Sequence, residues 1–292
     1  MPTQVVANGV IAASAYALIG VSFALIYRVA RFFHIAHGVI FTAGAYCVFL
    51  CQVFLGLPLA VCIPLAAFSC ASFGAVTELM LFAPLRRRGA SPAILLLASL
   101  GTYVVMQNLI SLLFGNDMKA LRVGPPTEGV PILGARVTPV QLATLCTALL
   151  LVLAVAGVLR CTDTGRAVRA VADDAELAKA AGVDSDRVIL WTFAVASALV
   201  GVAGVLVAMD VGMTPTMGLA ALMMGVVAAI VGGVGSVGGV ALGALVLGMA
   251  QHLGAWKTAA QWQDTIAFGL LLLFLLVRPQ GVLGRPLRKV TV

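Results

Sequence analysis

The chain has 292 residues, of which 62% are hydrophobic and only 10% are charged, and its formal net charge is +7. Soluble globular chains carry about 25% charged residues, so this composition excludes a water-soluble domain. Apolar runs of about 20 residues can cross a bilayer as helices, which satisfy their own backbone hydrogen bonds in lipid. The sequence therefore predicts an all-α, polytopic transmembrane helical bundle that forms a single domain over residues 1–292.

The apolar segments follow one another along most of the chain. They cover residues 5–27, 32–55, 57–82, 92–114, 138–159, 188–208 and 263–277. The first segment is too long for the apolar core of a secretory signal and follows no basic residue, so we expect it to remain as a true span. A Gly-rich stretch at residues 218–254 holds either two spans or two half-helices broken at residues 232–239. We expect about eight or nine spans in total.

Lysine and arginine predict the orientation, because short cytoplasmic loops retain positive charge. Alternate loops divide these residues unevenly. One side holds Arg28, Arg31, Arg86, Arg87, Arg88, Arg160, Arg166, Arg169, Lys179, Arg187, Arg278, Arg285, Arg288 and Lys289, and the other holds Lys119, Arg122, Arg136 and Lys257. The richer side is predicted to be the cytoplasm, with the N-terminus outside and the C-terminus inside. The positive charge then serves topology beside anionic lipid, and it requires no nucleic-acid partner.

Two loops are long, and they differ in composition. The loop at residues 115–137 is rich in Pro and Gly and is predicted to be extracytoplasmic, whereas the loop at residues 161–187 is predicted to be cytoplasmic. In the second loop, Asp173 can cap a helix, Glu176 can complete a capping box, and Gly182 suits the left-handed position after the last turn. A helix this short is marginal alone in water, so we expect it to dock on a partner. The alternative is an ordinary surface helix packed on its own bundle.

Several motifs resemble catalytic or ligand-binding sites, but the surrounding sequence lacks the other features that such sites require. Gly233, Gly235 and Gly238 have the spacing of a dinucleotide loop, but no strand precedes them, and no P-loop motif for ATP occurs in the chain. His34 and His37 lie one helical turn apart without a third metal ligand nearby. The six cysteines include no CxxC pair. We therefore expect no catalytic residue, no metal site, no disulfide and no cofactor in this chain.

Intramembrane acidic residues are too few for an obvious ion-coupling site. Glu78 lies close to the arginines at 86–88, so an ion-paired or snorkelling carboxylate is favoured over a proton relay. Several polar or glycine positions at helix depth remain candidates for lining a transport path. They are Asn8, His37, Gln107, Asn108, Gly233, Gly235 and Ser236.

Motifs along nearly the whole chain share one family pattern. They are Asn8-Gly9 and residues 16–20 in the first apolar segment, residues 35–38 and 44–46 in the second, Arg88-Gly89-Ala90, Gln107-Asn108, residues 232–236, and residues 277–281. Together with the cytoplasmic loop, these motifs resemble the LivH-type branched-chain amino-acid permease family, the membrane subunits of ATP-binding-cassette importers. His34 stands where Asn is more usual in that family.

The resemblance implies a non-catalytic transport subunit of the inner membrane. A second related permease, two ATPase subunits that bind ATP and magnesium, and an extracytoplasmic substrate-binding protein would be its partners. The cytoplasmic loop would be the coupling element, with the matching positions Gly165, Arg166, Arg169, Ala170, Asp174, Glu176, Ala178 and Gly182. Permeases for urea or short amides are similar, so the substrate stays open, and an ion-coupled secondary transporter is the alternative from another class.

Overall fold

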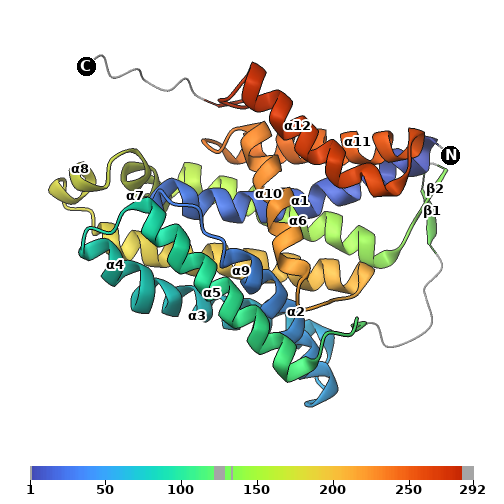
Figure 1. The fold of residues 1–292 in the computed structure, drawn as a ribbon, viewed down its shortest axis with the longest axis horizontal. Helices are drawn as coiled ribbons and strands as arrows, with labels where there is room; N and C mark the ends of the chain where they lie inside the picture. Colours follow the sequence, from blue (N-terminus) through green and yellow to red (C-terminus); the bar gives the residue numbers. More distant parts are fainter. Residues whose placement is uncertain (1, 122–128, 133, 285–292) are drawn as a thin grey trace. The chain divides into compact units, whose positions relative to one another are not determined.

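The computed structural model describes residues 2–121, 129–132 and 134–284 and confirms a polytopic helical membrane protein (Figure 1). Arg122, Arg285, Arg288 and Lys289, which entered the charge argument, lie outside the described residues. The helices are α1 Pro2–Ala30, α2 His37–Val53, α3 Leu59–Thr77, α4 Ala83–Arg87, α5 Pro92–Phe114, α6 Pro139–Cys161, α7 Asp163–Asp173, α8 Ala175–Ala180, α9 Ser185–Val211, α10 Met217–Gly232, α11 Val237–Lys257 and α12 Gln263–Val277.

Shorter elements complete this list. A π-helical turn at Glu78–Phe82 joins α3 to α4, so that residues 59–87 form one continuous helix, and a 3₁₀ turn at Ala260–Trp262 precedes α12. Strands β1 (Val130–Ile132) and β2 (Ala135–Val137) pair antiparallel within the Pro- and Gly-rich loop. This hairpin was not predicted, because strands of three residues are too short to produce a recognisable pattern.

Seven described helices are long and apolar enough to cross a membrane, and α2 and α10 are two shorter apolar helices. At about 1.5 Å per residue, these two helices are about 25 Å long, which is less than the hydrocarbon core of about 30 Å. The Gly-rich stretch is broken between α10 and α11, inside the predicted interval. The second apolar segment was predicted to begin at residue 32, but its helix begins at His37.

Backbone contacts divide the chain into two compact units. The first contains residues 1–24, 127–152 and 223–292, and the second contains residues 25–126 and 153–222. The single-domain organisation stays a prediction.

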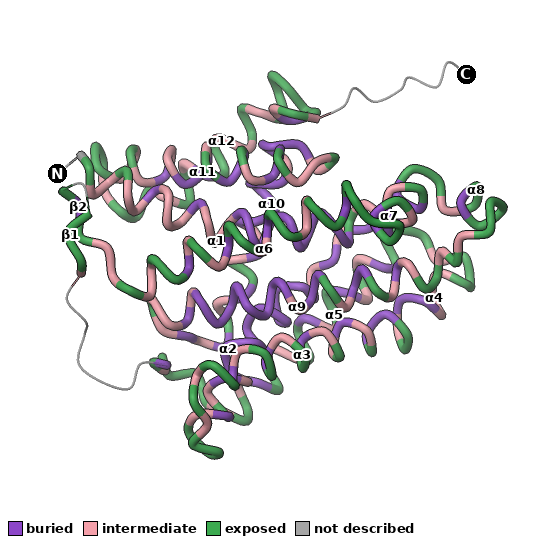
Figure 2. The backbone as a smooth tube through the Cα atoms, turned by 180° about the vertical axis from the view of Figure 1, so that it is seen from behind, coloured by how far each residue is buried: buried purple, intermediate pink, exposed green. Residues whose placement is uncertain are grey.

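In the second unit, α9 is the central helix and packs against α2 and α3. Figure 2 shows buried backbone along much of α9, in agreement with the run of buried residues from Leu199 to Leu206. Small residues allow this close approach: a Cβ atom added to Gly204 would lie 1.9 Å from the carbonyl oxygen of Phe41, and one added to Gly44 would lie 2.4 Å from that of Gly201. Close packing of small residues is the usual basis of helix association in membranes.

The second unit contains the starts of two short helices, α2 and α10, of which residues 217–222 belong to this unit. The linker 31–36 leads from α1 to α2, and the linker 212–216 leads from α9 to α10. The first turns of α2 and α10 meet, since a Cβ atom on Gly218 would lie 2.0 Å from the carbonyl oxygen of Gly38. The same first part of α2 lies against Gly204, in the C-terminal half of α9. Both are short apolar helices that follow an irregular linker, and short or broken helices of this kind form transport sites in other membrane transporters.

In the first unit, α1 packs against α10 and α11 through glycines. Gly20 lies against Gly225, and Gly9 lies against Gly248. The chain after α12 returns to the α10–α11 turn, where the backbone N–H groups of Val282 and Leu283 donate to carbonyl oxygens at the end of α10.

Candidate functional site

The predicted coupling loop folds into two helices, α7 and α8, rather than one. Thr162 caps α7 by accepting a hydrogen bond from the backbone N–H of Gly165 (3.1 Å). A Cβ atom on Gly165 would lie 2.2 Å from the carbonyl oxygen of Val158 in α6. Gly165 therefore allows α7 to turn back closely on the end of α6.

The second helix begins one residue later than the sequence predicted. Asp174, not Asp173, is its N-cap: the carboxylate accepts from the backbone N–H groups of Glu176 (2.9 Å) and Leu177 (3.0 Å). Asp173 instead ends α7, because its backbone is still helical and its neighbour takes an extended conformation at φ −155°. The predicted capping site was therefore shifted by one residue, since both positions hold the same side chain.

Gly182 ends α8 as predicted. Its φ is +87°, its N–H donates to the carbonyl of Lys179, and the N–H of Val183 donates to that of Ala178. This pair of hydrogen bonds is a Schellman motif, in which a residue with left-handed backbone satisfies the last helical carbonyls. The short helix thus carries a complete cap at each end, which makes its shape well defined.

One face of the two helices packs inward and the other is exposed. Val168, Val171 and Ala178 are buried, whereas Glu176 and Leu177 are exposed. Leu177 leaves 69% of its surface open. Leu177 was not among the predicted coupling residues, although it is the one large apolar side chain in a short helix of otherwise Ala, Glu and Lys, and an exposed apolar side chain of this size can contact another surface.

The other predicted coupling residues have distinct local roles. Arg166 is exposed and pairs with Asp163, and the carbonyl of Ala170 accepts from the N–H of Asp174. Arg169 holds a buried guanidinium nitrogen that has no hydrogen-bond partner among the described residues. A surface pocket of about 270 Å³ lies at the end of α8. Its lining residues are Lys179, Gly182, Val183, Asp184, Ser185 and Asp186.

The linker 31–36 is held from several sides within the second unit. The Arg31 guanidinium donates to the carbonyl oxygens of Ala172 and Asp173 at the end of α7. The backbone N–H of Ala36 donates to the Ser99 hydroxyl in α5 (2.8 Å), and His34 Nδ1 shares a hydrogen bond with the same hydroxyl (3.0 Å). His34 is fully buried, and no third ligand makes a metal site with it among the described residues.

Glu78 is ion-paired, as the sequence indicated. Its carboxylate lies 2.5 Å from the Arg86 guanidinium, and Arg86 and Arg87 also contact Asp186 in the first turn of α9. Glu78 is buried and belongs to the π-helical turn, so the pair ties the end of α3 to the start of α9.

Four of the candidate path residues belong to the first unit. Gly233, Gly235 and Ser236 lie together in the α10–α11 turn, where Ser236 caps α11 by accepting from Gly239 N–H (3.0 Å). Within the same unit, Asn8 accepts a hydrogen bond from Gln4 (3.0 Å), and its neighbour Gly9 packs against Gly248 and Met249 in α11. The turn residues thus have clear structural duties, and whether any of these positions lines a path stays a prediction.

Three candidates belong to the second unit. His37 is fully buried in the first turn of α2, next to the Gly38–Gly218 contact. Gln107 is half-buried in α5, and Asn108 is exposed and donates to the carbonyl of Val104 in its own helix. Of the three, only His37 lies at the meeting point of α2 and α10.

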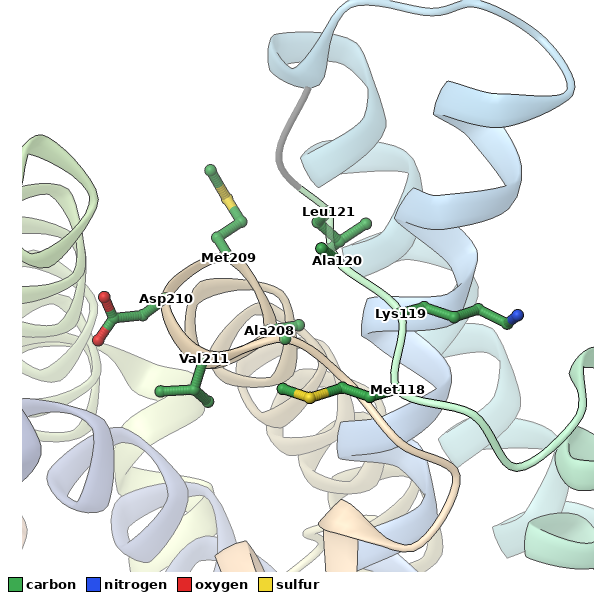
Figure 3. A pocket seen from close by; sticks show the side chains of 9 residues that line it. Met118, Lys119, Ala120, Leu121, Ala208, Met209, Asp210 and Val211 are labelled. Atoms are coloured by element: carbon green, nitrogen blue, oxygen red, sulfur yellow. The ribbon is translucent and has the colours of Figure 1, made fainter. Parts of the chain in front are cut away.

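A second pocket, of about 310 Å³, lies between the segment after α5 and the end of α9 (Figure 3). Lys119 and Met213 exchange both backbone hydrogen bonds there (2.9 and 2.8 Å). The side chains of Lys119 and Asp210 point away from each other, and Met118 extends toward Val211. The pocket therefore offers backbone and apolar groups and no facing pair of charges.

Comparison with known proteins covers nearly the whole chain. A family model described as branched-chain amino acid transport system / permease component matches residues 5–276. The chain is 33% identical to the high-affinity branched-chain amino acid transport system permease protein BraD of Pseudomonas aeruginosa, over 97% of this chain and 96% of that protein. The corresponding LivH proteins of Salmonella typhimurium and Escherichia coli K12 are 33% and 32% identical, over 96% of this chain and 94% of each relative.

No solved structure matches the chain significantly. The family match and the full-length relatives agree with the seven long apolar helices. The chain is a multi-pass membrane protein that belongs to the family of permease components of branched-chain amino acid transport systems.

Proposed function

We propose that this chain moves branched-chain amino acids across the inner membrane by alternating access, as the permease subunit of an ATP-binding-cassette importer. The observation that carries this proposal is the similarity to BraD and LivH over 96–97% of the chain. The transport systems named for these relatives carry branched-chain amino acids, and the same substrate class is assigned here.

The assembly consists of this chain, a second related permease, two ATPase subunits and an extracytoplasmic substrate-binding protein. ATP and magnesium are bound by the ATPase subunits, because the chain holds no P-loop sequence. This chain performs no covalent chemistry and holds no cofactor of its own. Its orientation, with the N-terminus outside, places α7 and α8 beside the ATPases.

The contact with an ATPase subunit is assigned to the exposed face of α7 and α8. Leu177 is the apolar anchor, and the exposed residues Arg166 in α7 and Glu176 in α8 supply charged groups. Gly165, Asp174 and Gly182 act by fixing the shape of the two helices through close packing and caps. Arg169 and Ala178 lie on the inner face of the same element, and Ala170, which is exposed, lies on its outer face.

The transport path is assigned to the region where α2 and α10 begin. Short or broken helices supply free helix ends and irregular backbone, which membrane proteins tolerate only inside protein or beside a water-filled cavity. His37 and the Gly38–Gly218 contact lie at this point. In the structure the contact is tight, so passage of a solute requires the two first turns to separate.

Reconstitution tests the proposed function. The chain is purified gently from its native membrane, its associated proteins are identified by mass spectrometry, and the complex is placed in proteoliposomes with ATP and the binding protein. We expect ATP-dependent uptake of labelled leucine, isoleucine or valine, and much less uptake of urea or acetamide.

Two other results would redirect the assignment. Preferred uptake of urea or acetamide would establish a permease of the same kind with an amide substrate. A chain recovered alone, with uptake driven by a proton or sodium gradient and indifferent to ATP, would contradict the importer and support a secondary transporter.

A further inference from the structure

Arg31 has a backbone conformation that its residue type disfavours. Its φ is +57°, and no other described residue except glycine has a positive φ. In the left-handed region the Cβ atom of an L-residue crowds the following carbonyl, which is why glycine usually occupies it. The linker between α9 and α10 starts with Gly212 at φ +84°, so the analogous position there has the residue expected for this conformation.

A strained residue persists only when its surroundings hold it, and such residues concentrate at functional positions. The side chain of Arg31 shows what holds it. One guanidinium nitrogen donates to the carbonyl oxygens of Ala172 (2.5 Å) and Asp173 (3.0 Å), the last two residues before the α7–α8 corner. Carbonyls at a helix C-terminus lack helical partners and carry partial negative charge, which a cation stabilises.

The residues that follow Arg31 in the chain are also held in place by contacts. Phe32 packs against Phe82 with a ring separation of 5.0 Å and stacks on Phe193 at 6.5 Å. Four residues further on, Ala36 N–H is bonded to Ser99, and α2 begins directly afterwards. The linker is thus a rigid segment attached at one end to the corner of α7 and α8 and at the other to α2.

We propose that Arg31 is a positioning residue that transmits movement of the α7–α8 element to the linker 31–36 and so to the first turn of α2. The proposal rests on the proposed function, in which α7 and α8 contact the ATPase. When the α7–α8 corner moves, the Arg31 guanidinium moves with the carbonyl groups that it binds. The linker 31–36 then transmits this displacement to the first turn of α2, which packs against Gly218. Arg31 acts through these elements and does not contact the solute.

The test uses the complete transporter in proteoliposomes, with the number of substrate molecules imported per ATP hydrolysed as its readout. Arg31→Gln removes the cation, and Arg31→Gly removes it while also relieving the backbone. Arg278→Gln is the matched control, because Arg278 is an exposed arginine at the end of α12, outside the coupling element.

We expect both Arg31 variants to import at least threefold fewer molecules per ATP, whereas Arg278→Gln matches the wild type. Arg31→Lys should recover part of the loss, because its ammonium group can still donate to the carbonyls. The melting temperature of the Arg31→Gly complex should not fall, since glycine is favoured at this φ. A lower number of imported molecules per ATP at an unchanged melting temperature distinguishes transmission of movement by Arg31 from a role in stability alone.

Three outcomes overturn the proposal. An unchanged ratio in Arg31→Gly and Arg31→Gln shows that the contact does not transmit movement. A reduced ratio together with a lowered melting temperature in Arg31→Gly shows that Arg31 only stabilises the fold. A wild-type complex without ATP-dependent uptake defeats the proposed function itself, and this is seen before any variant is compared.

Discussion

At the scale of single residues, the meeting of α2 and α10 depends on the absence of side chains. Gly218→Ala would place a Cβ atom 2.0 Å from the Gly38 carbonyl oxygen and 2.5 Å from Thr42 Oγ1. Backbone on one side cannot move away cheaply, so the overpacking should cost about 1–3 kcal/mol. We expect a lower melting temperature for this variant in detergent, measured by intrinsic tryptophan fluorescence.

Gly101→Ala in α5 is the control for this prediction, since a Cβ atom there would meet nothing within 4 Å. Replacing an open helical glycine by alanine should stabilise the helix by about 0.5–1 kcal/mol. Equal melting temperatures for Gly218→Ala and the wild type would contradict the close contact between the two first turns.

Local backbone signals could be predicted from the sequence, and distant contacts could not. Gly182 was correctly assigned to a left-handed position, because a helix end is encoded by a few neighbouring residues. The cap was placed on Asp173 instead of Asp174, because adjacent aspartates look alike without the backbone. Arg31 gave no signal at all, because its partner carbonyls lie 141 and 142 residues further along the chain.

At the scale of elements, hydropathy correctly predicted that the helices exist, but it predicted their first residues less accurately. Residues 32–36 are mostly apolar and read as the beginning of a span, but the bonds of Ala36 and His34 to Ser99 hold them outside the helix. The break between α10 and α11 was predicted because glycine is frequent there, and Gly233 adopts φ +99° at that point. A hairpin such as β1–β2 is too short to produce a pattern.

The short helix α8 provides the prediction at this scale. Gly182→Val places a β-branched residue at φ +87°, which should strain the Schellman motif and distort the end of the helix. In reconstituted complexes, we expect ATP hydrolysis to continue while substrate uptake falls severalfold, because the contact with the ATPase no longer has its fixed shape.

Gly89→Val is the matched control for Gly182→Val. Gly89 also has a positive φ, of +73°, and open space around its Cβ position, but it lies in the turn between α4 and α5. Both variants carry a similar backbone strain, of about 1–3 kcal/mol. Equal loss of uptake per ATP in the two variants would mean that strain alone, and not the coupling element, explains the effect.

At the scale of the whole molecule, two helix pairs repeat one another. Gly20 in α1 contacts Gly225 in α10, and Gly201 in α9 contacts Gly44 in α2. The interval from 20 to 201 equals the interval from 44 to 225, and the interval from Arg31 to Gly212 is the same again. Since α1 and α9 are predicted to cross the membrane in opposite directions, the equal intervals are those that an inverted-topology repeat would leave in the sequence.

The predicted orientation in the membrane can be tested with two single-cysteine variants. Asp117→Cys, in the segment after α5, and Glu176→Cys, in α8, are each introduced into a variant whose six natural cysteines are replaced and which retains uptake. Because cytoplasmic loops retain arginine and lysine, α8 should face the cytoplasm and residue 117 the outside.

In right-side-out membrane vesicles, we expect a membrane-impermeant maleimide to label the cysteine at position 117 and not the one at position 176. After detergent permeabilisation both should react, because both native residues are exposed. The reverse pattern would place α7 and α8 on the side of the binding protein, where no ATPase can reach them. It would therefore remove Leu177 and Arg31 from any role in coupling, while leaving the family assignment intact.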